Sequence, residues 1–310
     1  MSRSEVRAEL DQALQGFISD GNDLPGLHSE AQRSAFLEQL VDSERRNRYY
    51  SRLLERSIGQ GSGNPASAGF NPLSAAVLFE REGNRDEAFW MVFLSVHFGK
   101  SRRSGWRLVA DVYGRLEAGG RWTWEAVSSD VSDFRTWLED HIDSIRALEP
   151  PRRFGNHRKY ESLDGWSASG TGSVVASYVD WVGGARSHDV RLTDELASSN
   201  GDPRVGFRDL YRSIRRVHRF GRTAAFDYCS TVSKLGLAPI EPAMAALSGA
   251  TGPLSGAKLL FGPLADGRTP NEIEDLLAPL KDRLGIGYDA LEDALCNWQK
   301  SPDRFMPFRG

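Results

Sequence analysis

The longest apolar run in this 310-residue chain is Ala88-Phe-Trp-Met-Val-Phe-Leu-Ser-Val96, and it lies within a segment of helical periodicity, Pro72–Phe98. The run is about half as long as a helix that crosses a bilayer. The N-terminal residues are charged and include no apolar segment typical of a secretory signal. We therefore expect a soluble, cytoplasmic protein with no membrane partner.

Helical periodicity continues on both sides of this run. Apolar residues recur at steps of three and four in the segments Ser2–Ile58, Trp106–Leu116 and Asp130–Leu148. The alternation with period two that indicates strands is scarce, and no repeat of solenoid length is present. The sequence therefore predicts an all-α or mostly α-helical fold.

A stretch rich in glycine and serine, Gly59–Gly69, interrupts the helical pattern and has the composition of a flexible connector. It predicts an N-terminal helical region at 1–58 and a linker at 59–69. A larger helical domain would then cover 70–300, and a C-terminal tail would cover 301–310.

The overall charge gives no reason to expect a polyanion-binding protein, because 39 Lys and Arg stand against 42 Asp and Glu. A hydrophobic content of 40% and a charged content of 26% are ordinary for a globular protein and exclude a wholly disordered or collagen-like chain. The charge is segregated, however. The segment Arg204–Arg222 holds seven arginines and one acid, Asp209, whereas acids predominate in Asp266–Asp293.

The arginine-rich segment has the pattern of an amphipathic helix. Its apolar residues Phe207, Leu210, Ile214 and Val217 fall on one side, and on the other side lies an arginine stripe formed by Arg204, Arg208, Arg212, Arg215 and Arg219. A solvated charged face is one interpretation, and contact with phosphate groups is the other. We favour phosphate contact because the stripe lacks the acids at i+4 that usually limit self-repulsion.

Two further basic stretches occur, one with Lys100, Arg102, Arg103 and Arg107, the other with Arg152, Arg153, Arg158 and Lys159. The three basic stretches share a short motif, which reads His97-Phe-Gly-Lys100, Arg153-Phe-Gly-Asn156 and Arg219-Phe-Gly-Arg222. In each, the phenylalanine can anchor the chain while the glycine permits a tight turn and a close backbone approach. We expect amides and guanidinium groups to meet a nucleic-acid backbone at these positions.

Several kinds of chemistry are excluded by missing motifs. The six histidines are scattered and the two cysteines, Cys229 and Cys296, are isolated, so we expect core thiols, no metal and no cofactor. The sequence has no GxxxxGK[ST] loop, no GxGxxG after a strand and no GxSxG motif. Nucleotide hydrolysis and α/β-hydrolase chemistry are therefore not expected.

Two segments retain residues suited to chemistry. In Arg153–Ser162, Asn156 can read a base edge and Tyr160 can stack on a base, although a polar surface loop would have the same composition. Asp227 lies in an apolar helical segment five residues after Arg222. A carboxylate there needs either a structural partner, such as a nearby arginine, or a function.

The segment Leu247–Ala257 places three glycines and a proline between two apolar helical patterns. It resembles a helix-hairpin-helix turn, whose amides hold DNA phosphate at a helix N-terminus. Any tight turn between helices uses the same residues. Lys258, which follows, is then a phosphate contact, a solvated lysine or a Schiff-base amine.

Taken together, several segments resemble the alpha-glutamyl/putrescinyl thymine pyrophosphorylase superfamily, which is associated with hypermodified bases in phage DNA. They are Phe93–Lys100, Trp106–Trp124, Arg153–Ser162, Arg219–Pro242 and Gly249–Gly262. A bacterial branch is more similar to the chain than the phage branch, and it implies an anti-phage DNA glycosylase of helix-hairpin-helix-like architecture that removes glucosylated hydroxymethylcytosine. The phage branch has a bulky apolar residue where this chain has Asp227, which favours hydrolytic base removal.

The resemblance also implies roles for individual residues. Asp227 would be the catalytic carboxylate, Arg222 its orienting partner or a phosphate clamp, and Asp266 the second candidate acid. The base pocket would comprise Asn156, His157, Tyr160, Phe226 and Tyr228. The expected DNA contacts are Lys100, Arg103, Arg153, Arg158, Lys159, Arg204, Arg208, Arg212, Arg215, Arg219, Gly249, Thr251, Gly252 and Lys258.

Two other functions remain open at this point. A transferase or pyrophosphorylase acting on hydroxymethylpyrimidine in DNA would consume a small donor, and a non-enzymatic nucleic-acid-binding module would release no base. The lysine that strand-nicking relatives carry just behind the hairpin glycine is missing, so we expect a monofunctional enzyme that leaves an abasic site. Double-stranded phage DNA with modified bases is the expected partner, and no obligate protein partner is expected.

Overall fold

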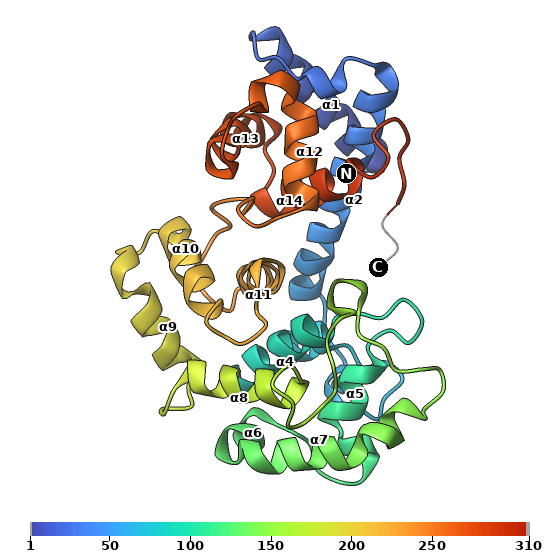
Figure 1. The fold of residues 1–310 in the computed structure, drawn as a ribbon, viewed down its shortest axis with the longest axis vertical. Coiled ribbons are helices and arrows are strands. Elements are labelled where there is room, and N and C mark those ends of the chain that lie inside the picture. The colour runs from blue at the N-terminus through green and yellow to red at the C-terminus, as the bar shows by residue number, and fades with distance from the viewer. Residues whose placement is uncertain (1, 308–310) are drawn as a thin grey trace. The chain divides into compact units, whose positions relative to one another are not determined.

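The computed structural model describes residues 2–307, which form 14 α-helices and no β-strand (Figure 1). The predicted all-α fold is confirmed. The described chain divides into two compact units: unit 1 comprises residues 2–51 and 242–307, and unit 2 comprises residues 52–241. Among the described residues, no helix combines the length and the apolar character that a membrane span requires.

Unit 1 is built from both ends of the chain. Its helices are α1 (Arg3–Ser19), most of α2 (Glu30–Glu55), α12 (Gly252–Phe261), α13 (Pro270–Leu284) and α14 (Tyr288–Trp298). Leu14 and Phe36 share one fully buried core with Leu277 and Trp298, and the rings of Phe36 and Trp298 lie 5.1 Å apart. The amphipathic faces of the N-terminal helices are thus covered by the C-terminal helices.

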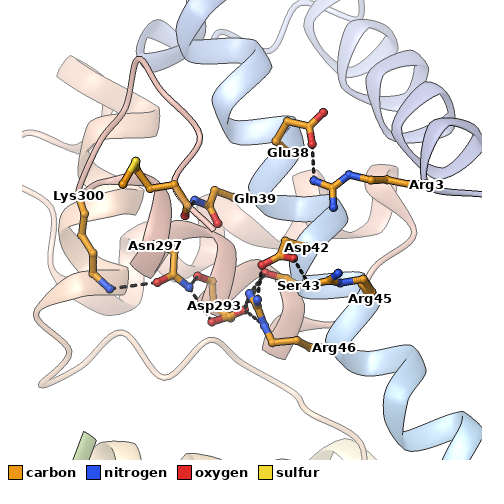
Figure 2. A network of polar contacts seen from close by, with 11 residues as sticks. Arg3, Glu38, Gln39, Asp42, Ser43, Arg45, Arg46, Asp293, Asn297 and Lys300 are labelled. Atoms are coloured by element: carbon orange, nitrogen blue, oxygen red, sulfur yellow. Dashed lines mark hydrogen bonds and ion pairs between the residues drawn. The ribbon is translucent and has the colours of Figure 1, made fainter. Parts of the chain in front are cut away.

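A polar network ties α2 to α14 within this unit (Figure 2). The Asp42 carboxylate is 2% exposed and pairs with Arg45 at 2.9 Å and with Arg46. Arg46 also donates from Nε to Asp293 at 3.0 Å, and the Ser43 hydroxyl donates to Asp293 at 2.7 Å. Asp293, counted above in the acidic segment, is therefore neutralised locally by an arginine of α2.

The predicted domain boundaries differ from this division. Residues 1–58 do not form a separate region, because their apolar faces are buried against residues 245–298. The segment predicted as a linker, Gly59–Gly69, contains a 3₁₀ turn (Gln60–Gly63) that contacts α3. A β-carbon added at Gly63 would lie 3.1 Å from a Leu78 methyl carbon, so this segment is packed into unit 2.

Unit 2 is organised around α4 (Arg85–Phe98), which contains the apolar run quoted at the outset. Every residue from Glu87 to Phe98 is buried. Helices on several sides account for this burial, because α4 contacts α3 (Pro72–Arg81), α5 (Arg107–Tyr113), α6 (Trp124–Ser129), α9 (His188–Leu196) and α11 (Arg222–Lys234). The unit also contains α7 (Val131–Arg146), α8 (Thr171–Val182) and α10 (Pro203–Ile214).

The arginine-rich helix is shorter than predicted. Helix α10 ends at Ile214, so Arg215 is its C-cap, and Arg219 lies beyond it with a φ of 58°. The predicted apolar face is confirmed, because Phe207, Leu210, Ile214 and Val217 are all at most 2% exposed.

Candidate functional site

Two of the three Phe-Gly motifs pack directly against each other in unit 2. The Gly155 amide donates to the Phe98 carbonyl at 2.8 Å, and the rings of Phe98 and Phe154 stack with centroids 5.5 Å apart. A β-carbon on Gly155 would lie 2.9 Å from the Gly99 Cα atom, so neither glycine leaves room for a side chain. These two glycines serve a close backbone contact within the protein rather than the predicted contact with phosphate.

The third motif joins the same region through its aromatic residue and its first arginine. Phe220 stacks on Phe93 of α4 at 5.3 Å between ring centroids. Arg219 donates to the Glu161 carboxylate at 2.6 Å and to the Tyr160 carbonyl at 3.2 Å. All three motifs thus gather around the C-terminal half of α4, next to the start of α11.

Arg158 occupies the centre of this region and is nine-tenths buried, with 9% of its side chain exposed. Its Nε atom donates to the Val96 carbonyl of α4 at 2.9 Å. Its Nη2 atom has no hydrogen-bond partner and lies 3.6 Å from Oδ2 of Asp227. Arg158 was expected to contact DNA phosphate; in the structure its guanidinium group is enclosed by the protein and faces the Asp227 carboxylate.

Asp227 is the most accessible residue on its turn of α11, with 47% of its side chain exposed. Its neighbours Phe226 and Tyr228 are 3% and 1% exposed, because α11 buries that side against other helices of the unit. Desolvation by the surrounding protein raises the pKa of Asp227 above its ordinary value, although Arg158, His157, Arg222 and Lys234 act to lower it. A carboxylate with a raised pKa that remains open to solvent is typical of a catalytic site.

Two residues of α11 that were predicted to act with Asp227, Arg222 and Phe226, contact each other. Arg222 stacks over the Phe226 ring, with its guanidinium carbon 5.1 Å from the ring centroid. Phe226 itself packs edge-on against Phe207 at 6.1 Å. Phe226 and Tyr228, which were predicted to line a base pocket, are buried in the core of unit 2.

Tyr228 instead ends a buried hydrogen-bond chain through four helices. Its hydroxyl lies 3.0 Å from the Tyr178 hydroxyl, which lies 2.8 Å from Nε2 of His188, and Nδ1 of His188 lies 2.7 Å from Oδ1 of Asp86. Burial lowers the pKa of His188, so its ring is neutral. Because a carboxylate only accepts, Nδ1 donates to Asp86, Nε2 accepts from Tyr178, and Tyr178 accepts from Tyr228.

This chain of hydrogen bonds fixes the position of α11 relative to α4, α8 and α9. Although burial acts to raise the pKa of Asp86, hydrogen bonds from His188 lower it below its ordinary value. The roles of Asp86 and His188 could not be predicted from the sequence, because the two residues are 102 positions apart and neither belongs to a recognisable motif.

His97 forms a second buried contact beside Arg158. It is 2% exposed, and its Nε2 atom lies 2.9 Å from the Thr171 hydroxyl oxygen. Burial, together with the nearby charges of Arg158 and Arg219, lowers the pKa of His97 to about 3. His97 is therefore neutral at physiological pH and adds no positive charge to the site.

The remaining predicted pocket residues lie on the loop that carries Arg158. Asn156 and His157 are exposed in the short 3₁₀ turn Asn156–Arg158. Tyr160 is 80% exposed, and the Lys159 ammonium lies 5.0 Å from the centroid of its ring. An exposed aromatic ring with a cation beside it is suited to stacking on a base.

The predicted DNA contacts of unit 2 are mostly exposed, and some are paired. Lys100, Arg103, Arg153, Arg208 and Arg215 are exposed. Arg204 pairs with Glu241 at 3.1 Å, Arg212 with Asp209 at 3.0 Å and Arg219 with Glu161 at 2.6 Å. The expectation that the stripe lacks acidic partners is therefore wrong for these three arginines.

The predicted hairpin residues and Asp266 belong to unit 1. No helix precedes the turn, because residues 235–251 contain only turns and irregular backbone, so the helix-hairpin-helix motif is absent from this segment. Glu274 accepts hydrogen bonds from the amides of Ala246 and Leu247 at 2.9 and 3.2 Å, and a β-carbon on Gly252 would lie 2.7 Å from the Cys296 sulfur. The turn is thus fixed by contacts within unit 1.

The other residues of this group lie on the surface of unit 1. Thr251 is the N-cap residue of α12, and Gly249 precedes it with a φ of 77°. Lys258 is exposed on α12, and Asp266 is exposed after the short 3₁₀ turn Gly262–Ala265. The exposed position of Asp266 contrasts with that of Asp227, which faces the enclosed guanidinium group of Arg158 and is therefore the stronger candidate for the catalytic carboxylate.

These observations define an all-α protein whose second unit presents a half-exposed carboxylate to an enclosed guanidinium group. The chain belongs to the alpha-glutamyl/putrescinyl thymine pyrophosphorylase family, because the model of clade 3 of that family matches residues 31–310. The predicted superfamily is thereby confirmed. No curated protein matches the chain, and no solved structure matches it.

Proposed function

We propose that this protein is a DNA glycosylase that excises a hypermodified pyrimidine, such as glucosylated hydroxymethylcytosine, from phage DNA and leaves an abasic site. The family name refers to modified thymine, which supports a modified pyrimidine as the target. The observation that carries the proposal is the pair formed by Asp227, open to solvent, and Arg158, enclosed and 3.6 Å away.

The chemistry of base release requires such a carboxylate. Cleavage of the N-glycosidic bond develops positive charge on the sugar, which a carboxylate stabilises while it accepts a proton from the attacking water. Asp227 must be ionised for both tasks. Burial raises the pKa of Asp227, so its carboxyl group becomes protonated at a higher pH than an ordinary aspartate does. We therefore expect the rate of base release to decline with falling pH, starting at a higher pH than with an ordinary carboxyl group.

The surface around Asp227 offers groups that a DNA substrate needs. Lys100, Arg153 and Lys159 are exposed on the converging Phe-Gly loops and can contact phosphate. Tyr160 can stack on a base or fill the space of a base that has left the duplex. Asn156 and His157, on the same loop, can contact the edge of the extruded base.

Transfer to the base by a pyrophosphorylase is the second candidate, which the family name favours. That reaction needs a donor with a pyrophosphate leaving group and therefore cations grouped around phosphates. At the proposed site the enclosed cation, Arg158, faces Asp227 instead. This pairing supports hydrolysis, and we take the protein to act without a donor.

The proposal is tested by Asp227→Asn, with Asp180→Asn as the matched control because Asp180 is an exposed acid on α8 of the same unit. With duplex DNA carrying one glucosylated hydroxymethylcytosine, we expect Asp227→Asn to slow base release about 10³-fold while DNA affinity is retained. Asp180→Asn should behave as wild type. Base release by Asp227→Asn at the wild-type rate would show that Asp227 is not the catalytic carboxylate.

Strand cleavage provides a separate readout. We expect the product DNA to contain intact abasic sites, and Lys258→Ala to release base as wild type does, because no Schiff base is formed. Strand breaks that disappear in Lys258→Ala would instead indicate a lyase.

A further inference from the structure

The guanidinium group of Arg158 contains a hydrogen-bond donor that the protein leaves unused. Arginine has five N–H donors, and nearly all buried donors in folded proteins have a partner. Nε of Arg158 donates to the Val96 carbonyl at 2.9 Å, whereas Nη2 is buried without a hydrogen bond. An enclosed donor of this kind reduces stability unless a ligand completes it.

The surroundings of Arg158 keep this donor in place and charged. Its aliphatic stem packs on the Gly99 backbone, where an added β-carbon would lie 3.5 Å from its Cγ atom. Burial lowers the pKa of Arg158, while Asp227 and Glu161 act to raise it. Glu161 is already bonded to Arg219, so Asp227 is the acid that Nη2 faces, at 3.6 Å and without a hydrogen bond.

From this geometry we infer that Nη2 of Arg158 donates a hydrogen bond to O2 of the target pyrimidine as the base leaves. The inference rests on the proposed function and adds a second catalytic residue to it. In the reaction the C1′–N1 bond breaks and its electron pair passes to the base, where the negative charge is shared by N1 and O2. The oxygen of water bonds to C1′, one of its protons stays on the new hydroxyl group, and the other passes to Asp227. Asp227 then gives that proton to the released base anion through water, which yields neutral base and restores the carboxylate.

The position of the donor follows from the position of the acid. Asp227 must lie beside C1′ to stabilise the positive sugar, and O2 is attached to the carbon next to N1, so O2 lies close to C1′. A donor 3.6 Å from the Asp227 carboxylate is therefore within reach of O2. Because the charge on O2 develops only as the bond breaks, this hydrogen bond strengthens in the transition state.

The first test replaces Arg158 by methionine, with Arg152→Met as the matched control. Arg152 is a second enclosed arginine of the same segment, with 6% of its side chain exposed, and it pairs with Asp111. In single-turnover assays on duplex DNA with one glucosylated hydroxymethylcytosine, we expect Arg158→Met to slow base release about 100-fold. Its DNA affinity and the salt dependence of that affinity should not change, and folded Arg152→Met should react at the wild-type rate.

The second test alters the substrate, so it stands even if Arg158→Met folds poorly. In a matched duplex the target base carries sulfur in place of O2, and sulfur accepts hydrogen bonds weakly. The quantity compared is the ratio of the rate with the oxygen substrate to the rate with the sulfur substrate. We expect this ratio to be about tenfold larger for wild-type protein than for Arg158→Met. An equal ratio of the two rates in both proteins overturns the inference.

Two further outcomes separate the possible failures. If Arg158→Met weakens DNA binding and lowers its salt dependence but reacts normally once saturated, Arg158 is a phosphate contact and the inference is wrong, while the proposed function stands. If wild-type protein releases no base from the oxygen substrate, both the proposed function and the inference are wrong.

Discussion

Replacement of Gly155 by alanine tests the convergence of the Phe-Gly motifs on which the site depends. The new β-carbon would lie 2.9 Å from the Gly99 Cα atom and 2.9 Å from the Lys100 nitrogen, both of which are backbone atoms. Gly155 has a φ of −61°, which alanine adopts readily, so the penalty is one of packing alone. The two loops must move apart by a few tenths of an ångström, which costs about 1–3 kcal/mol.

The same displacement reaches the site, because Arg158 follows Gly155 by three residues and is bonded to Val96 of α4. We expect base release by the folded variant to fall roughly tenfold, since small misplacements of catalytic groups carry large costs. Denaturant unfolding measures the stability, and single-turnover assays measure the rate. The control is Gly184→Ala, where no atom lies within 4 Å of the added carbon. Equal stability and rate in the two variants would refute the proposed packing of the loops.

Three further predictions concern pH, unit 1 and DNA binding. In the folded protein the pKa of His97 is about 3, whereas in the unfolded chain the pKa of histidine is about 6.5. Between these two values the unfolded chain binds one more proton than the folded protein. The free energy of unfolding therefore decreases by about 1.4 kcal/mol for each pH unit as the pH falls through this range. His97→Gln should flatten that slope in unfolding curves between pH 7 and 4, and an unchanged slope would contradict this. Arg46→Met should lower the free energy of unfolding by about 2–3 kcal/mol. Arg45→Met removes a 68% exposed partner of the same Asp42 and should lower it by less than about 1 kcal/mol. Equal effects of the two substitutions would argue against a stabilising role of the network. The double variant Arg208→Gln/Arg215→Gln should make the negative slope of log DNA affinity against log salt concentration less steep by about 2. An unchanged slope would show that these arginines are solvated and do not contact phosphate.

The fold class could be predicted because local periodicity determines it. Apolar residues at helical spacing identified α4 and the buried face of α10 correctly. The division into units could not be predicted, since Leu14 and Trp298 reveal their common core only in three dimensions. Composition also could not reveal how the Gly59–Gly69 segment packs, because glycine that allows flexibility also allows the tight packing seen at Gly63.

The candidate site was predicted in part. A lone acid in an apolar helix drew attention to Asp227, since its cost requires an explanation. Composition could not distinguish Arg158 from its neighbours Arg153 and Lys159, because burial depends on packing against α4. Tyr228 follows Asp227 directly in the sequence, and on a helix this adjacency places the two residues on different sides of α11, so only Asp227 is accessible.

Several of the charged side chains that the sequence places in separate acidic and basic segments are paired with each other or with other residues in the structure. In unit 1, Asp293 is neutralised by Arg46, and in unit 2 three arginines of the basic segment pair with acids. The exposed cations that retain the capacity to contact phosphate, such as Lys100 and Arg208, are therefore fewer than the sequence indicates. We expect a DNA affinity that depends on salt, with contributions from this smaller set.

Hydrolytic release of a modified base is the central claim, and one measurement tests it most directly. Purified protein is incubated with duplex DNA carrying glucosylated hydroxymethylcytosine in the absence of any nucleotide or other donor, and free base and abasic sites are counted. The account predicts equal numbers of both, and none from unmodified DNA. DNA that keeps all its bases under these conditions, and is altered only when a donor is supplied and consumed, would contradict it.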